Sequence, residues 1–112
     1  MGVRQGDIYL MAVPYSDLSG RKTRPVLVVS KDDFNNGLED VIICGITSNS
    51  NQERDCISIT NKDTKEGCLD YKSMIKVENI FKVDKVLLLR KIGCIKKEKV
   101  LKVIKKLNFL FS

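Results

Sequence analysis

The sequence predicts a β-rich α+β fold, a small curled antiparallel sheet or barrel with a helix near its C-terminal end. Three observations favour this class. Short β-prone segments alternate with polar loops, and an amphipathic helical pattern ends the sequence. Between them, Val26–Val29 is apolar at every residue, which is typical of a strand buried on both faces. Because 112 residues give room for one modest core, we expect a single domain over residues 1–112.

The first half of the chain predicts four short apolar strands, Gly6–Val13, Val26–Val29, Val41–Thr47 and Cys56–Ile59. Ser30 precedes the acidic Asp33 by three residues, in the spacing of a capping box with Asp in place of Glu. We therefore expect a short helical turn over Asp32–Asn35, between the second strand and the third.

The second half predicts one more strand, Ser73–Val77, and a terminal helix. Asn61–Gly67 has the composition of a polar turn, and the mixed segment Phe81–Leu89 has a predicted turn at Asp84–Lys85. The helix is indicated by apolar residues that share one face at i, i+3 and i+4 spacing. These residues are Val100, Val103, Ile104, Leu107 and Leu110.

Composition excludes several classes of protein. No apolar run approaches the ~20 residues of a membrane span, and no signal peptide is recognisable, so we expect a cytoplasmic protein without a membrane partner. The chain has no histidine and no Cys-x-x-Cys pair, which argues against a metal site, and nothing indicates a cofactor. Cys44 lies in an apolar strand and is interpreted as a small buried hydrophobe.

The positive charge is concentrated in the C-terminal part of the chain. Residues 82–112 carry ten Lys and Arg against two acids, whereas the preceding 81 residues carry ten basic and twelve acidic groups. This imbalance is compatible with a polyanionic partner. For the helix alone, a solvated lysine-rich face is the simpler interpretation.

Two strand ends carry side chains suited to a phosphate. Pro25 fixes its own φ and holds Arg24 extended at the start of an apolar strand, and Thr47-Ser48 ends the next strand. A fixed guanidinium and two hydroxyls would bind phosphate oxygens well. Alone, each has a plainer explanation: Arg24 as an edge arginine paired with Asp17, and Thr47 as a β-branched strand terminator.

Taken together, these motifs resemble the MazF/PemK family of toxin–antitoxin endoribonucleases. The resemblance covers nearly the whole chain in the family's order. It rests on Gly6–Leu10, Arg24–Ser30, Val41–Ser48 and Val83–Lys85. It implies a homodimeric barrel that cleaves single-stranded RNA without a metal, leaves 2′,3′-cyclic phosphate and 5′-hydroxyl ends, and is blocked by a cognate antitoxin.

The resemblance also implies roles for individual residues. Arg24 and Thr47 match the family's catalytic arginine and threonine. Ser48 lies where some members have a second hydroxyl. Asp17 matches a family glutamate used in RNA binding or cleavage, although the spacer before Arg24 is longer here. Lys76 and Glu78 align with a basic-x-acidic pair, in which the family's usual residues are Arg and Asp.

RNA contacts beyond these are expected in two polar loops, Tyr15–Thr23 and Ser48–Arg54, through Arg21, Lys22 and Asn49. Because the chain has no histidine, Asp17 and Glu78 are the candidate general bases. Arg24 and Lys76 are the candidate acids. Arg24 suits stabilisation of transition-state charge better than proton transfer, because its guanidinium stays protonated.

Two other functions remain open on the sequence alone. A toxin of the same barrel type could inhibit a protein target such as DNA gyrase, as CcdB-like toxins do, and its action would then depend on the C-terminal helix. A degenerate barrel could serve only as a partner-binding module. The presence of both Arg24 and Thr47 favours the endoribonuclease.

Overall fold

A computed structural model of the chain describes residues 2–12, 23–48, 56–67, 69 and 72–111. Its strands are β1 (Asp7–Ala12), β2 (Thr23–Val28), β3 (Asp40–Thr47), β4 (Cys56–Ile59), β5 (Thr64–Gly67), β6 (Ser73–Asp84) and β7 (Leu88–Ile95). Its helices are α1 (Asp32–Gly37), α2 (Lys97–Phe111) and the short 3-10 turns η1 (Asn61–Asp63) and η2 (Lys85–Leu87). No helix among the described residues is long and apolar enough to cross a bilayer.

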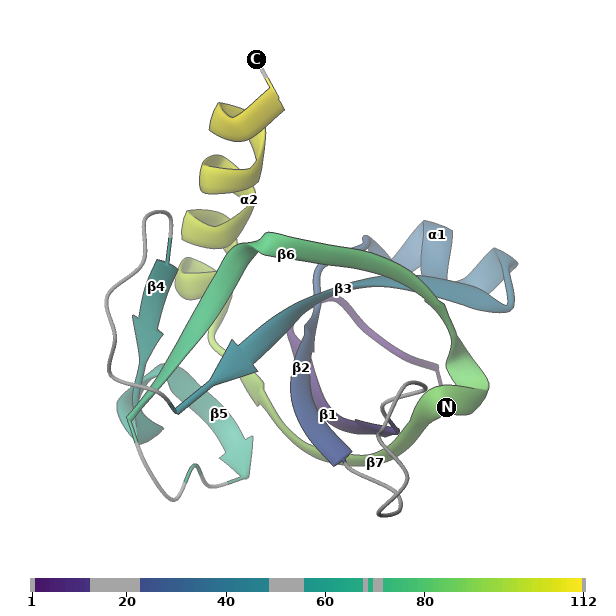
Figure 1. The fold of residues 1–112 in the computed structure, drawn as a ribbon, viewed down its shortest axis with the longest axis horizontal. Helices are drawn as coiled ribbons and strands as arrows, with labels where there is room; N and C mark the ends of the chain where they lie inside the picture. The colour runs from purple at the N-terminus through teal and green to yellow at the C-terminus, as the bar shows by residue number, and fades with distance from the viewer. Residues whose placement is uncertain (1, 13–22, 49–55, 68, 70–71, 112) are drawn as a thin grey trace, which may run out of the picture.

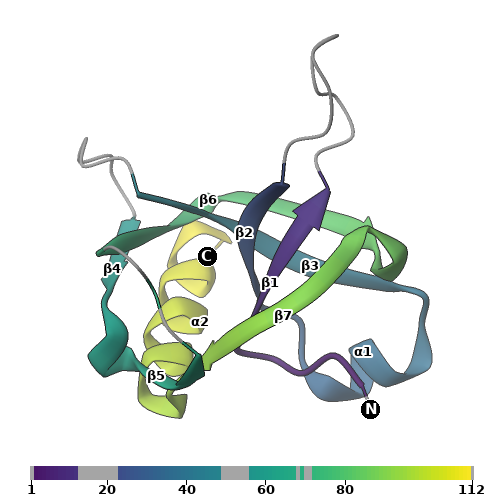
Figure 2. The same cartoon turned by 90° about the horizontal axis from the view of Figure 1, so that it is seen from below.

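The strands form one antiparallel sheet in the order β4-β6-β3-β2-β1-β7-β5. β2 is therefore the central strand, which agrees with the burial of Val26, Leu27, Val28 and Val29. The sheet is strongly curled, so that β6 arches over β2 and β1 (Figures 1 and 2). The predicted fold class is confirmed.

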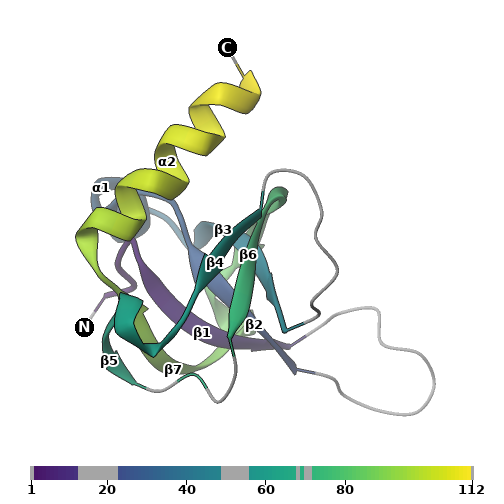
Figure 3. The same ribbon diagram turned by 90° about the vertical axis from the view of Figure 1, so that its left-hand side faces the viewer.

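The two faces of the sheet are closed in different ways. One face, here called the helix face, packs against Val103 and Leu107 of α2 and contains buried residues such as Leu27 and Ile75. Figure 3 shows α2 standing along one side of the sheet. The other face, here called the groove face, carries a smaller buried cluster of Met11, Val26, Val28, Val41 and Ile43. Among the described residues, this cluster contains no side chain of α1 or α2, and Leu87 of the short turn η2 packs against it.

A bulge in β6 changes which residues lie on each face. Gly45 of β3 pairs with Lys76, but its neighbour Cys44 pairs with Ile80, so residues 77–79 have no partner on β3. Side chains alternate along a strand, and an odd number of inserted residues shifts this alternation by one. The groove face therefore receives Lys76 before the bulge and Phe81 after it.

The chain ends are tied to the sheet by polar contacts. Gly6 has a φ of 96°, a conformation that suits glycine, and its N–H donates to the carbonyl of Val28 at 2.8 Å. A Cβ at Gly6 would lie 3.0 Å from Val100, so this turn also allows α2 to approach closely. At the start of α2, Lys99 forms an ion pair with Asp63 at 3.6 Å.

Most predicted elements are confirmed, with three corrections. The turn at Asp84–Lys85 is present, and the apolar face of α2 faces the core. The predicted strand Ser73–Val77 extends to Asp84, because Phe81 and Val83 continue the pairing with β3. β7 was not predicted. β5 was not predicted either, since Asn61–Gly67 has the composition of a turn.

The predicted capping box at Ser30 is wrong. The N-cap of α1 is Lys31, with no side-chain cap. The Ser30 hydroxyl instead donates to Oδ1 of the buried Asn35 and accepts the backbone N–H of Ile42 at 3.0 Å. Ser30 therefore ties α1 to β3, a tertiary role that the local spacing does not reveal.

Candidate functional site

Arg24 and Thr47 meet at the ends of two neighbouring strands. β2 pairs with β3 through Val26 opposite Gly45 and Leu27 opposite Cys44. Continued by two residues, this register sets Arg24 opposite Thr47 on the groove face. Arg24 is exposed, and no described residue pairs with its guanidinium. The extended conformation imposed by Pro25 thus presents a cation beside a hydroxyl.

Lys76 is brought to the same place from the other side of β3. It lies opposite Gly45, two residues from Thr47 along β3. Because this residue is a glycine, it adds no side chain between the three polar groups. Arg24, Thr47 and Lys76 therefore come from three adjacent strands and share one face of the sheet.

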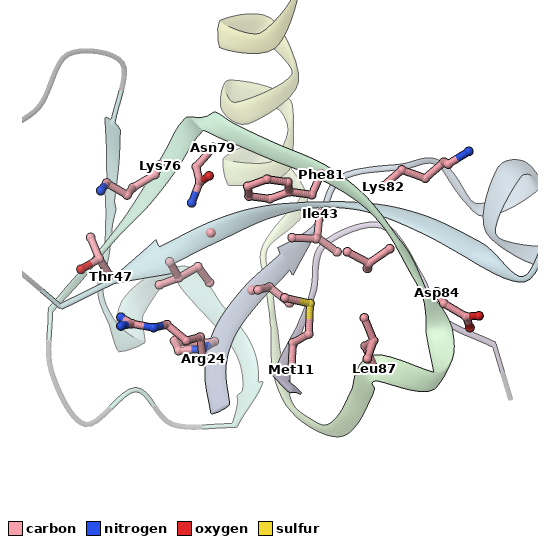
Figure 4. A pocket seen from close by; sticks show the side chains of 15 residues that line it. Met11, Arg24, Ile43, Thr47, Lys76, Asn79, Phe81, Lys82, Asp84 and Leu87 are labelled. Carbon is pink, nitrogen blue, oxygen red and sulfur yellow. The ribbon is translucent and has the colours of Figure 1, made fainter. Parts of the chain in front are cut away.

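These three side chains occupy one end of a cavity of about 530 Å³. Figure 4 shows the guanidinium of Arg24, the hydroxyl of Thr47 and the amine of Lys76 gathered there. Further along, the wall is apolar and includes Met11 and Leu87. The cavity thus joins a positively charged end to an apolar section.

Asn79 and Phe81 form the upper wall of this cavity in Figure 4. Both lie on β6: Asn79 is the last residue of the bulge, and Phe81 follows it by two residues. Both are exposed, and the exposed fraction of Phe81 is 47%. The Asn79 amide lies directly over Gly45, because a Cβ built there would be 2.7 Å from Asn79 Nδ2. No described residue hydrogen-bonds to the Asn79 side chain.

The structure brings some of the predicted site residues together and separates others. Arg24, Thr47 and Lys76 line the cavity. Ser48 is exposed next to Thr47 but does not line the cavity. Glu78, which lies in the β6 bulge, does not line the cavity either. Four other predicted residues lie outside the described part of the chain. These are Asp17, Arg21, Lys22 and Asn49.

Sequence reasoning missed Asn79 and Phe81 as lining residues. Their i, i+2 spacing was a usable signal, since alternate residues of a strand share a face. The signal was hidden because the predicted strand ended at Val77, where the bulge begins.

The cavity contains little negative charge of its own. Asp84, the one acid that lines it among the described residues, lies toward the opposite end from Arg24 (Figure 4). No group of three acidic or cysteine side chains in the described ranges could hold a metal ion. Cys44 is no nucleophile either, because burial raises the pKa of its thiol to about 12. The site offers cations and hydrogen-bond donors, and these suit an anionic ligand.

The fold and site together define a class: a small curled antiparallel sheet with a terminal helix and a cationic cavity where β2, β3 and β6 meet. The family model of the PemK-like, MazF-like toxin of type II toxin–antitoxin systems matches residues 4–111. The chain therefore belongs to this toxin family, as the motifs in the sequence had indicated. No curated protein sequence matches it.

Solved structures have the same fold at low sequence identity. Toxin MazF-mt6 of Mycobacterium tuberculosis is 17% identical with a TM-score of 0.75, and the match covers 94% of this chain and 95% of that one. An endoribonuclease from a mycobacterial species, in complex with its cognate antitoxin, is 18% identical with a TM-score of 0.76, covering 97% and 94%. MazE–MazF of Deinococcus radiodurans is 15% identical with a TM-score of 0.78, covering 97% and 95%.

Proposed function

We propose that this toxin is an endoribonuclease that cleaves single-stranded RNA, such as mRNA, at short sequences without a metal ion. One observation carries the proposal: Arg24, Thr47 and Lys76 share one end of a cavity with room for a nucleotide. Family membership supports it, as does a solved relative described as an endoribonuclease. The site and its RNA substrate would be in the cytoplasm.

In the proposed reaction the RNA supplies its own nucleophile. A base removes the proton of the 2′-hydroxyl, the 2′-oxygen bonds to the neighbouring phosphorus, and the bond from phosphorus to the 5′-oxygen breaks. The 5′-oxygen leaves with a proton. The products are a 2′,3′-cyclic phosphate and a 5′-hydroxyl, and no atom from a cofactor or from water is consumed in this step.

The residues at the cationic end have roles that follow from their chemistry. The planar guanidinium of Arg24 donates two parallel hydrogen bonds to the non-bridging phosphate oxygens, where negative charge develops. Thr47 donates a third hydrogen bond from its hydroxyl. Lys76 carries protons close to the phosphate and is assigned to the leaving 5′-oxygen. Asp17 and Glu78 stay as the alternative bases, although Glu78 does not line the cavity.

We also infer that a cognate antitoxin inhibits the protein and that the toxin is a homodimer. Solved relatives include complexes of MazF with MazE, which supports the first inference. Exposed apolar side chains beyond the groove, among them Val86 and Leu89, support an interface with a second copy. A monomeric mass by light scattering at micromolar concentration would contradict the dimer.

The test of the nuclease is cleavage of a long single-stranded RNA in EDTA by the wild type and by Arg24→Ala. Wild type should cut at discrete sites and leave cyclic or 3′-phosphate ends. Arg24→Ala should reduce the rate about 10²–10³-fold, which is the usual cost of losing one preorganised donor to a developing anion. Cut sites and end groups are mapped by sequencing and end-labelling.

The matched control is Arg4→Ala, an exposed arginine that does not line the cavity. It should cut as the wild type does. Full activity in Arg24→Ala would overturn the assignment of Arg24. A folded wild type that cuts no RNA would overturn the nuclease and favour a toxin that acts on a protein target.

A further inference from the structure

We infer that Asn79 and Phe81 form a nucleobase subsite beside the cationic end of the cavity, with Asn79 determining which base is accepted. This inference rests on the proposed function, since it concerns the RNA that the same site would cleave. It places a base contact on β6, in addition to the RNA contacts that the sequence predicts in the two polar loops, Tyr15–Thr23 and Ser48–Arg54.

The cavity has the two surfaces that one nucleotide requires. Its cationic end, at Arg24 and Lys76, suits a phosphate, and its lining also includes apolar residues such as Met11 and Leu87. A nucleobase is flat and largely apolar on its faces but polar along its edge. A bound base would therefore lie on the apolar section while its phosphate contacts the cations.

Phe81 provides the flat surface. Phe81 is 47% exposed and lines the cavity opposite Met11 and Leu87 in Figure 4, so its side chain is accessible to a ligand. Proteins that bind single-stranded nucleic acid commonly stack bases on such rings. Stacking accepts any base, and so Phe81 contributes affinity rather than selectivity.

Asn79 provides the edge contact. Its amide has a donor group and an acceptor in one plane, the arrangement that pairs with the edge of a base. Both are available, because no described residue hydrogen-bonds to this side chain. It lies two residues from Phe81, so both project from β6 onto the same wall of the cavity.

The β6 bulge and Gly45 together position this amide. In an uninterrupted strand, Lys76 and Asn79 would lie on opposite faces, since they are three residues apart. The unpaired residues 77–79 bring both to the groove face. Gly45 then leaves space for the amide, which would lie 2.7 Å from a Cβ at that position. Gly45→Ala should displace the Asn79 amide without disturbing the fold, because the clash is with the end of a flexible side chain.

The experiment measures binding of RNA that cannot be cut. Fluorescent decamers carry 2′-O-methyl groups in place of the nucleophilic hydroxyls, with a single base type in each: adenine, cytosine, uracil or 7-deazaguanine. Anisotropy gives four dissociation constants for the wild type, and the ratio of weakest to tightest measures base preference. The same four are measured for Asn79→Ala, Gly45→Ala and Phe81→Leu.

Asn79→Ala and Gly45→Ala should each lower the ratio of the weakest to the tightest dissociation constant by about fivefold or more, as expected for loss of one bidentate base contact. Phe81→Leu should weaken binding of all four by about fivefold or more, and leave the ratio nearly unchanged. Matched controls are Asn108→Ala and Phe109→Leu, exposed residues of α2 on the other side of the sheet. Both should bind as the wild type does.

The inference is overturned if the wild type has no base preference, or if Asn79→Ala keeps the wild-type ratio while folded. The apolar section would then more simply accept a side chain of a protein partner. Because these decamers cannot be cleaved, the result does not depend on the nuclease test. A preference that requires Asn79 in a protein that cuts no RNA would retain the subsite and reject the nuclease.

Discussion

The helix face and the groove face belong to the same strands but are built differently. On β6, Ile75 points to the helix face and is fully buried against the core beneath α2. Six residues later, Phe81 points to the groove face and is nearly half exposed. Arg24, Thr47, Lys76, Asn79 and Phe81, the described cavity-lining side chains proposed to act on RNA, lie on the groove face, whose buried cluster contains no residue of α1 or α2.

This difference indicates how the molecule separates stability from function. The helix face buries most of the large apolar residues and so contributes most of the hydrophobic stabilisation. The groove face can then leave polar and aromatic side chains uncovered. Its shape depends on the β6 bulge, which turns two stretches of one strand onto the same side. Changes on the two faces should therefore have separable effects.

The largest expected difference between the two faces is in the free energy of unfolding, when Ile75→Ala on the helix face is compared with Phe81→Leu on the groove face. Ile75→Ala should lower the free energy of unfolding by about 2–5 kcal/mol, because it leaves a cavity in a packed core. Phe81→Leu should lower it by about 1 kcal/mol or less, since the ring is half exposed. Urea denaturation followed by circular dichroism measures both. Equal losses would mean that the groove face is as important to stability as the helix face.

A smaller effect is expected at Asn35 of α1, whose side chain is fully buried. Its side-chain amide donates to the backbone carbonyl of Ser30 at 2.9 Å, and the backbone carbonyl of Asn35 accepts from the Lys85 amine. Asn35→Ala removes the side-chain contacts and leaves the hydroxyl of Ser30 without Asn35 Oδ1 as the acceptor of its proton, although it still accepts the N–H of Ile42. We expect a loss of about 1–3 kcal/mol in urea denaturation. Asn36→Ala, at an exposed neighbouring position, should cost much less.

Much of this fold could be predicted from local patterns in the sequence. Val26–Val29 and the apolar face of α2 have the periodicity of buried elements, and both are confirmed. β7 was missed because its burial is irregular and its first half is largely exposed. β5 was missed because it is an edge strand that pairs only with β7. Strand pairing, rather than composition, makes these two segments extended.

The candidate site was predictable only in part, for a related reason. Arg24 and Thr47 were predicted as site residues because each matches a family motif and lies at an end of a recognisable strand, Arg24 at the start of its strand and Thr47 at the end of the next. Asn79 and Phe81 depend on the β6 bulge, which is a tertiary feature. The same bulge keeps Glu78 away from the cavity lining, although a regular strand would place it beside Lys76. Spacing along a chain predicts proximity only while the strand is regular.

The smallest expected effect concerns the attachment of α2 to the helix face. Asp63 in η1 accepts the backbone N–H of Thr60 at 2.9 Å and pairs with Lys99 of α2. The Thr60 N–H, aided by Lys99, lowers the pKa of the Asp63 carboxyl from its usual value of 3.8. Because the folded state favours the ionised carboxylate, this interaction stabilises the fold at neutral pH and is lost as the pH falls through the lowered pKa.

Asp63→Asn should therefore lower the free energy of unfolding by about 1 kcal/mol at pH 7, a modest value because the carboxyl is partly exposed to solvent. The difference from the wild type should persist at pH 5 and shrink below about pH 4, where the wild-type carboxyl begins to protonate. Urea denaturation at pH 7, 5 and 3 measures it, with Asp33→Asn as an exposed control outside this contact. A difference that stays constant down to pH 3 would show that the charge of Asp63 does not hold α2 in place, and that the hydrogen bond to Thr60 is sufficient.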